Sequence, residues 1–167
     1  MLDAIRTRRS IRRYTGRPVS KESIETVLRS AMQAPSARNL QPWEFLVVQD
    51  GETLKRIPEF HPYSSMVPDA SAAILVCGNT RLQEMPGYLA QDCSAAVENL
   101  LLEAAGLGLG AVWLGVYPRE ERMKAMTDLF ELPEDILPMA LISVGFPAEK
   151  PEFQDRYTED KVHWENW

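Results

Sequence analysis

Arginine residues are concentrated near the start of the chain, in a pattern that suits the binding of an anion. Guanidinium groups match phosphate oxygens in pairs of hydrogen bonds, and Ser10 adds a hydroxyl donor among them. The alternative is a solvated helix face whose arginines pair with acidic residues elsewhere. The cluster by itself does not identify the anion. Six of the eighteen lysine and arginine residues form it: Arg6, Arg8, Arg9, Arg12, Arg13 and Arg17.

A glycine-rich stretch, residues 106–111, matches the G-x-G-x-x-A pattern of dinucleotide-binding loops. In such loops the glycines follow a strand and open a helix, so that the helix N-terminus meets the pyrophosphate. Here the glycines follow a long helical pattern and lead into an apolar strand. We therefore reject a dinucleotide-binding fold, and we predict that Gly106 ends the helix in the left-handed conformation.

Residue types that support metal or nucleophilic chemistry are scarce. The two histidines, His61 and His163, have no cysteine, histidine or carboxylate at ligand spacing, so no metal site is predicted. Cys77 and Cys93 lie in apolar segments and are expected to be inert buried thiols. No G-x-S-x-G motif or triad arrangement is present. We therefore name no catalytic residue, and an enzyme of this sequence would take its reactivity from a cofactor.

The elements that position these residues follow from the spacing of apolar side chains. Ser20 is a good N-cap for a helix, and Pro35 disfavours helical conformation in the residue before it. Residues 58–69 contain three prolines and no period, so they are expected to form a surface loop or lid. Four strands with helices on both faces is the economical arrangement. The pattern predicts helices over residues 2–9, 21–34, 52–57, 88–107 and 118–130, and strands over 43–49, 72–77, 111–117 and 141–146.

Length and composition indicate one soluble, cytoplasmic domain. The chain has 167 residues, of which 45% are hydrophobic and 25% charged, ordinary values for a globular protein. A net charge of -6 argues against nucleic-acid binding through the arginine stretch. Two cysteines are too few for a disulfide framework, which favours a reducing compartment. No apolar run is long enough to span a membrane.

Four segments in order resemble the signatures of the FMN-dependent nitroreductase family. The first is the arginine stretch at residues 8–14, and the second is the Pro-Ser loop that closes on Gln-Pro-Trp at residues 34–43. The third is residues 110–116, and the fourth is the ending from Gly145 through Arg156 to Trp164. The match covers essentially the whole chain, and four segments in sequence are specific where one would not be.

The resemblance implies an α+β fold of three layers, with a small mixed or antiparallel sheet flanked by helices. It implies a homodimer with FMN at the subunit interface. Residues 1–167 would form a single FMN-binding domain, in which residues 147–167 are an arm that reaches the partner subunit. In that arrangement residues 35–39 come from the other subunit, and the backbone at residues 113–115 passes near flavin N5. The implied cofactor-binding residues are Arg8, Arg9, Ser10, Arg12, Pro35, Ser36, Ala37, Arg38, Asn39, Trp113, Leu114, Gly115 and Arg156.

The resemblance also implies an activity. Hydride would pass from NAD(P)H to FMN and on to a nitroaromatic, quinone or similar conjugated acceptor in a ping-pong cycle. A lid over the acceptor would be formed by His61, Tyr63 and Met66 in the 58–69 segment. Reductive dehalogenation or flavin fragmentation is an alternative within the same fold. A flavin-binding or redox-sensing module without turnover is a second alternative.

Overall fold

The computed structural model describes all residues from Met1 to Trp167, and its centre is a four-stranded antiparallel sheet. The strands lie in the order β1-β2-β4-β3. The family-based prediction left open a mixed or an antiparallel sheet, and every pairing is antiparallel. The two edges are therefore β1 and β3. The strands are β1 (Trp43–Val48), β2 (Ala72–Asn79), β3 (Gly110–Gly115) and β4 (Ile136–Gly145).

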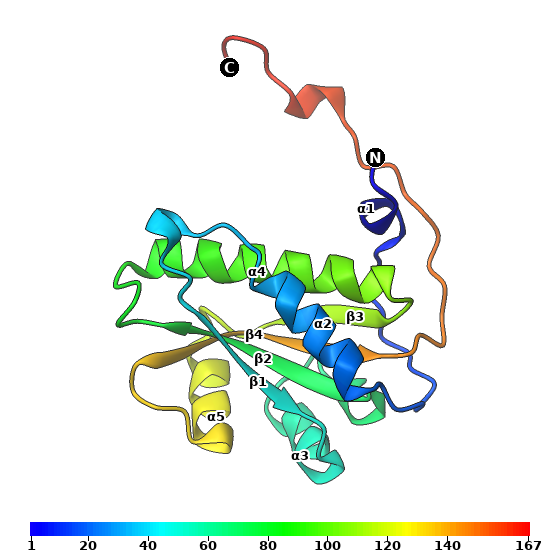
Figure 1. The fold of residues 1–167 in the computed structure, drawn as a ribbon, viewed down its shortest axis with the longest axis vertical. Coiled ribbons are helices and arrows are strands. Elements are labelled where there is room, and N and C mark those ends of the chain that lie inside the picture. The colour runs from blue at the N-terminus through cyan, green and yellow to red at the C-terminus, as the bar shows by residue number, and fades with distance from the viewer.

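Helices cover both faces of this sheet and make three layers (Figure 1). On one face lie α2 (Lys21–Ala31) and α4 (Pro86–Gly106), and on the other lie α3 (Gly51–Arg56) and α5 (Glu120–Phe130). A short helix, α1 (Asp3–Thr7), packs near the C-terminal end of α4. The predicted α+β fold with helices on both faces is confirmed.

Alternation along β2 explains why two separate cores form. Side chains of successive strand residues point to opposite faces of a sheet. Ile74 and Val76 thus join the core beneath α2 and α4, whereas Ala73 and Leu75 join the core beneath α3 and α5. All four side chains are fully buried. A strand buried on both faces reads as a continuous apolar run, which is the pattern of residues 72–77.

Local signals place the start of α2 correctly but not the left-handed residue that follows α4. The Ser20 hydroxyl accepts from the Ser23 backbone N–H at 3.2 Å, as expected for an N-cap. The prediction for Gly106 is wrong: the left-handed residue is Gly108, with φ of 73°. Backbone bonds from Gly108 N to Ala105 O and from Leu109 N to Ala104 O form a Schellman-type ending around it.

The last strand begins five residues earlier than predicted, at Ile136 instead of residue 141. Pro138 lies inside this strand, although proline cannot donate to a ladder. The pairing register shifts between Val76 and Cys77, so Met139 stands as an extra residue on β4. Its carbonyl accepts from Tyr117 N at 3.0 Å. This bulge lets the strand continue through the proline.

Residues 58–69 are more ordered and more deeply packed than a surface loop. They contain two 3-10 turns, η2 (Ile57–Glu59) and η3 (Val67–Asp69). His61, Ser64 and Met66 are buried. The expectation of an irregular surface loop is therefore wrong, because apolar and hydrogen-bonded side chains anchor the segment beneath the sheet.

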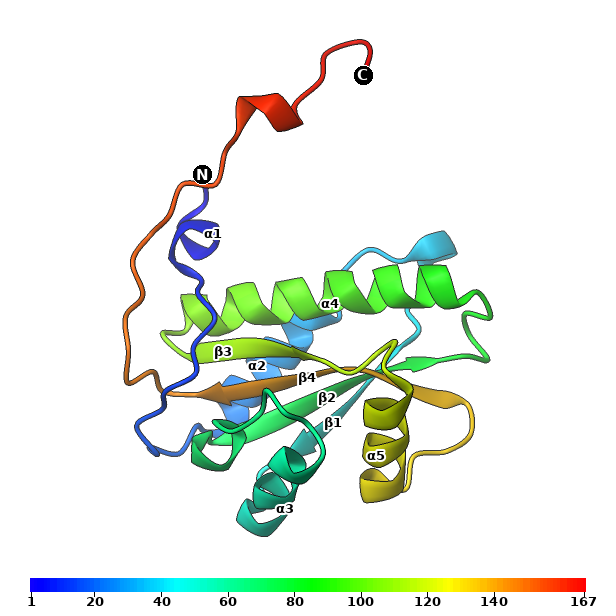
Figure 2. The same ribbon diagram turned by 180° about the vertical axis from the view of Figure 1, so that it is seen from behind.

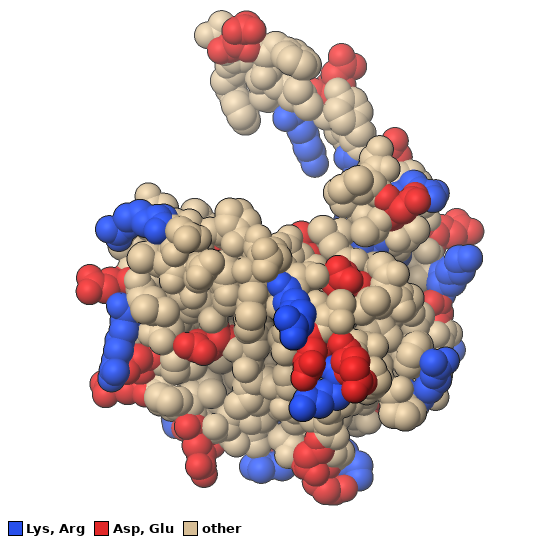
Figure 3. Space-filling model, in the orientation of Figure 1, with Lys and Arg blue, Asp and Glu red and all other residues tan.

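Residues 147–167 leave the body as an extended arm (Figures 1 and 3). Its start is fixed to the N-terminal segment, where Ala148 N donates to Arg13 O at 2.8 Å. Further along, Tyr157, Trp164 and Trp167 are exposed. None of the helices is long and apolar enough to cross a membrane.

Candidate functional site

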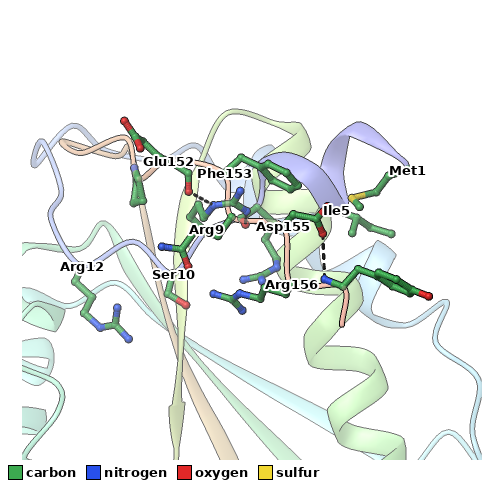
Figure 4. Close-up of a pocket in the computed structure, with 13 residues that line it drawn as sticks. Met1, Ile5, Arg9, Ser10, Arg12, Glu152, Phe153, Asp155 and Arg156 are labelled. Carbon is green, nitrogen blue, oxygen red and sulfur yellow. Dashed lines mark hydrogen bonds between the residues drawn. The ribbon is translucent and has the colours of Figure 1, made fainter. Parts of the chain in front are cut away.

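The arginine stretch and the start of the C-terminal arm together line one open cavity of about 650 Å³ (Figure 4). Arg8, Arg9, Ser10 and Arg12 come from the segment after α1, and Arg156 comes from the arm. Two carboxylates, Glu152 and Asp155, also line it, and they only partly offset four guanidinium groups. The cavity is therefore suited to an anion that carries more than one negative charge.

Backbone contacts hold the arginine stretch against the sheet. Ser10 pairs with Ala111 as a short parallel bridge, and Ile11 N donates to Ala111 O at 3.0 Å. A Cβ placed on Gly110 would lie 2.6 Å from the Ile11 side chain, so only glycine permits this approach. The stretch thus runs beside the open edge of β3, and its contacts with Gly110 and Ala111 determine its position.

The four arginines differ in how they are engaged. Arg8 lies 3.6 Å from Glu98 on α4. Arg9 donates to Glu152 O at 3.0 Å, and its guanidinium lies 5.4 Å from the Phe153 ring centre. The Arg12 and Arg156 side chains have no protein acceptor. Two guanidinium groups are therefore free to bind an anion, and two are oriented by the protein.

Three arginines of the stretch, Arg6, Arg13 and Arg17, do not line the cavity. Arg6 pairs with Asp3 at 3.1 Å within α1, and the Arg17 guanidinium lies 3.8 Å from the Phe146 ring centre.

A second cavity, of about 410 Å³, shares one lining residue with the first, Arg12. One wall is the end of β3, and the other is the segment between η2 and η3. The two cavities together offer a cationic end and a wall of backbone and aromatic groups. The lining residues of the second cavity are Arg12, His61, Pro62, Tyr63, Ser65, Met66, Trp113, Leu114 and Gly115.

Gly115 leaves the strand wall of this cavity open. A Cβ placed on Gly115 would meet no atom within 4 Å, so the space beside its backbone is empty. β3 is an edge strand, and the Ala111 carbonyl on its outer side already bonds Ile11 rather than a neighbouring strand. Odd-numbered residues of β3 therefore direct their backbone groups outward. A flat ring could approach this backbone closely.

Trp113 stands at the border between the second cavity and the core. Its side chain is 38% exposed. It lines the second cavity and also a small pocket of about 70 Å³ against α4, beside Cys93 and Val97. Leu114, by contrast, points into the opposite core and is buried. Trp113 therefore belongs to both environments.

The three side chains predicted as a lid all line the second cavity, but they are not alike. Tyr63 is 69% exposed, whereas His61 is 1% exposed and Met66 is buried. Burial lowers the pKa of His61, and its Nε2 lies 3.0 Å from Gly115 O. Only Tyr63 is placed at the rim, and a lid role for any of the three stays a prediction.

Residues 35–39 lie near the other end of α4, away from the arginines (Figures 1 and 2). Ala37 N donates to the buried Asp92 at 2.9 Å, and Ser36 Oγ accepts from Gln41 N at 2.9 Å. Arg38 and Asn39 have φ of 53° and 57°. Left-handed backbone at two non-glycine residues is unusual, and these two hydrogen bonds stabilise the loop. One chain does not bring this loop to the arginine cavity.

Two further observations concern possible metal ligands and possible nucleophiles. No group of three His, Cys, Asp or Glu side chains is arranged to hold a metal ion. Burial raises the pKa of both Cys77 and Cys93 to about 12, so neither thiol is a nucleophile near neutral pH. The prediction that these cysteines are buried is confirmed.

One residue of the site was missed from the sequence. Arg122, in the first turn of α5, donates from Nη1 to Gly115 O at 2.7 Å. Nothing in its local pattern distinguishes it from the other charged residues of an exposed helix.

Comparison with known proteins gives a consistent result. The model of the Nitroreductase family matches residues 5–64 and 61–146. A protein of Archaeoglobus fulgidus named “Putative NADH dehydrogenase/NAD(P)H nitroreductase” is 51% identical over 170 residues, which cover 99% of this chain and 98% of that one. A protein of the same name from Methanothermobacter thermautotrophicus is 49% identical over 167 residues, 100% of this chain and 87% of the relative.

A solved structure extends the comparison to the fold. The crystal structure of “a putative nitroreductase in complex with fmn” from Desulfovibrio desulfuricans is 34% identical, covers 99% of this chain and 96% of its own, and superposes with a TM-score of 0.85. The resemblance noted in the four sequence segments is thereby confirmed. The chain belongs to the nitroreductase family.

Proposed function

We propose that this protein is an NAD(P)H-dependent FMN oxidoreductase. The observation that carries the proposal is that two cavities share Arg12 as a lining residue, one lined by four arginines and the other by backbone and aromatic groups. Family membership and the FMN complex of the Desulfovibrio desulfuricans relative support it.

The residues present fit FMN at both ends. A phosphate dianion matches the excess of guanidinium over carboxylate in the first cavity, with Ser10 as a further donor. An isoalloxazine ring matches the second cavity, because the empty space beside Gly115 admits a flat group against the backbone. Arg8, Arg9, Ser10, Arg12 and Arg156 would hold the phosphate and ribityl end, and residues 113–115 would flank the ring.

When bound, FMN supplies a centre that accepts hydride from NAD(P)H and passes electrons to an acceptor in a ping-pong cycle. The chain's own residues bind, orient and shield. Tyr63 at the rim and the half-buried Trp113 restrict access, and they favour a flat conjugated acceptor such as a nitroaromatic or a quinone. No side chain is assigned as an acid or a base.

A second copy of the chain would complete the site. The loop at residues 35–39 is preformed by its contact with Asp92, yet it lies far from the arginines of its own chain. Three exposed apolar side chains lie near that loop: Met32 at the end of α2, and Met85 and Tyr88 at the start of α4. A homodimer would bring this loop to the partner's cavity and would also cover the aromatic side chains of the arm.

The decisive experiment is to purify the full chain and identify what it carries. A yellow protein that releases FMN on heating, consumes NADH or NADPH in the presence of menadione or a nitroaromatic, and sediments as a dimer supports the proposal. Failure of NADH and NADPH to bleach the bound flavin under anaerobic conditions would refute the oxidoreductase assignment. A colourless protein that FMN does not bind would refute the cofactor as well.

A further inference from the structure

The backbone carbonyl of Gly115 is held by two side chains from distant parts of the chain. Arg122 on α5 donates from Nη1 at 2.7 Å, and His61, between η2 and η3, lies with Nε2 at 3.0 Å from the same oxygen. A carbonyl oxygen has two lone pairs, so these two partners occupy both. Since β3 is an edge strand, no neighbouring strand supplies such contacts on this side.

The contact determines the tautomer of His61. A carbonyl oxygen only accepts, so Nε2 carries the hydrogen and donates it. Nδ1 is then the bare nitrogen, and it is buried without a partner. A proton on Nδ1 would be a buried donor without an acceptor, in the field of the Arg122 guanidinium. His61 therefore acts as a neutral donor.

Gly115 needs such anchoring because it has no side chain of its own. Glycine has more backbone freedom than any other residue, and the space beside this one is empty. The same anchor extends to the rim of the cavity. The Arg122 guanidinium lies 5.4 Å from the Tyr63 ring centre, and the His61 and Tyr63 rings meet edge to face at 6.5 Å. The end of β3, the rim of the cavity and α5 are thus linked through the side chains of Arg122 and His61.

We propose that Arg122 and His61 are positioning residues that hold the backbone at 113–115 where the isoalloxazine ring requires it. This inference rests on the proposed function. Hydride transfer is sensitive to placement, and a displacement of about 1 Å can slow a reaction about 100-fold. Loss of either donor should therefore slow flavin reduction more than it weakens FMN binding, because the phosphate contacts are made elsewhere.

The test compares R122M with the matched control R119M. Arg119 lies at the N-cap of α5, is exposed, and makes no side-chain hydrogen bond. In anaerobic stopped-flow with saturating NADPH or NADH, we expect flavin reduction in R122M to slow roughly 10- to 100-fold. FMN affinity, from titration of the apoprotein, should change by about threefold or less. R119M should match the wild type in both.

Two His61 variants provide an independent test of the same inference. Gln can donate from a position close to that of Nε2, whereas Leu cannot donate at all. We expect H61Q to retain most of the reduction rate and H61L to lose it as R122M does. If His61 only filled space, H61Q would not reduce flavin faster than H61L does. If R122M does not fold, R122K and these two variants decide the question.

Amide exchange of the apoprotein tests the anchor without flavin. We expect peptides covering residues 113–116 to exchange roughly tenfold faster in R122M and H61L than in R119M, as local opening becomes easier. Unchanged exchange, or faster exchange with an unchanged reduction rate, overturns the inference while the proposed function stands. A wild-type protein that binds no FMN overturns the proposed function, and the exchange data then decide only whether the anchor exists.

Discussion

Removal of single arginines from the first cavity should weaken FMN binding unequally. Arg156 has no protein acceptor and is exposed, so R156M removes one solvent-screened, charge-assisted contact. Arg8 is half-buried and lies 3.6 Å from Glu98. R8M removes a contact and also leaves the Glu98 carboxylate without its partner.

The size of each effect follows from the strength of hydrogen bonds to charged groups. Such bonds contribute about 1.5–3 kcal/mol, and each 1.4 kcal/mol is a tenfold change in affinity. The effect of R156M should therefore lie near the lower end of this energy range, which corresponds to roughly a tenfold weaker affinity for FMN. R8M should lie near the upper end, at roughly 100-fold, because repulsion from Glu98 adds to the lost contact.

The measurement is a fluorescence titration of apoprotein with FMN at low and high salt. The control is R13M, which removes an arginine of the same segment that does not line the cavity. R13M should bind like the wild type, and E98Q should partly restore affinity to R8M. Equal retention of FMN by R8M, R156M and R13M would show that the arginine cavity is not the phosphate site.

Three further predictions concern stability and assembly. Burial lowers the folded-state pKa of His61 below its unfolded-state value of about 6.5. Between the folded-state and unfolded-state pKa values, the unfolded chain therefore binds the proton more readily than the folded protein does. Thermal stability should be complete above about pH 6.5 and fall as pH drops toward the folded pKa, and a H61Q protein with the same pH profile would contradict this. G78A would place a Cβ 2.6 Å from the buried Leu89 side chain and should cost about 1–3 kcal/mol in denaturant unfolding, while G87A, with open space around it, should not. Deletion of residues after Arg156 should yield monomers or insoluble protein by sizing, and intact dimers would exclude the arm as a dimer contact.

Local sequence patterns were sufficient for the main elements. Ser20 predicted the start of α2, and continuous apolar runs predicted β2 and most of β3, because capping and burial act over a few residues. The errors arose where structure beyond the local pattern determines the conformation of a residue. Residues 136–140 were not predicted as a strand, yet β4 starts at Ile136 and a bulge near Val76 lets it continue through Pro138. Gly106 was chosen as the left-handed residue, yet the last turns of α4 place Gly108 there.

By itself, the sequence determined the resemblance to the nitroreductase family, and it predicted an anion-binding role for the arginine stretch without a metal site or a nucleophile. Those conclusions depend on residue types and on their order along the chain. The resemblance alone grouped Arg156 with Arg8 and Arg12, and the tertiary structure places all three around one cavity. Only the tertiary structure decided that Arg122 and His61 meet at the Gly115 carbonyl. The physical reason is that these contacts join segments far apart in the chain, and a periodic pattern carries information only about neighbours within a few residues.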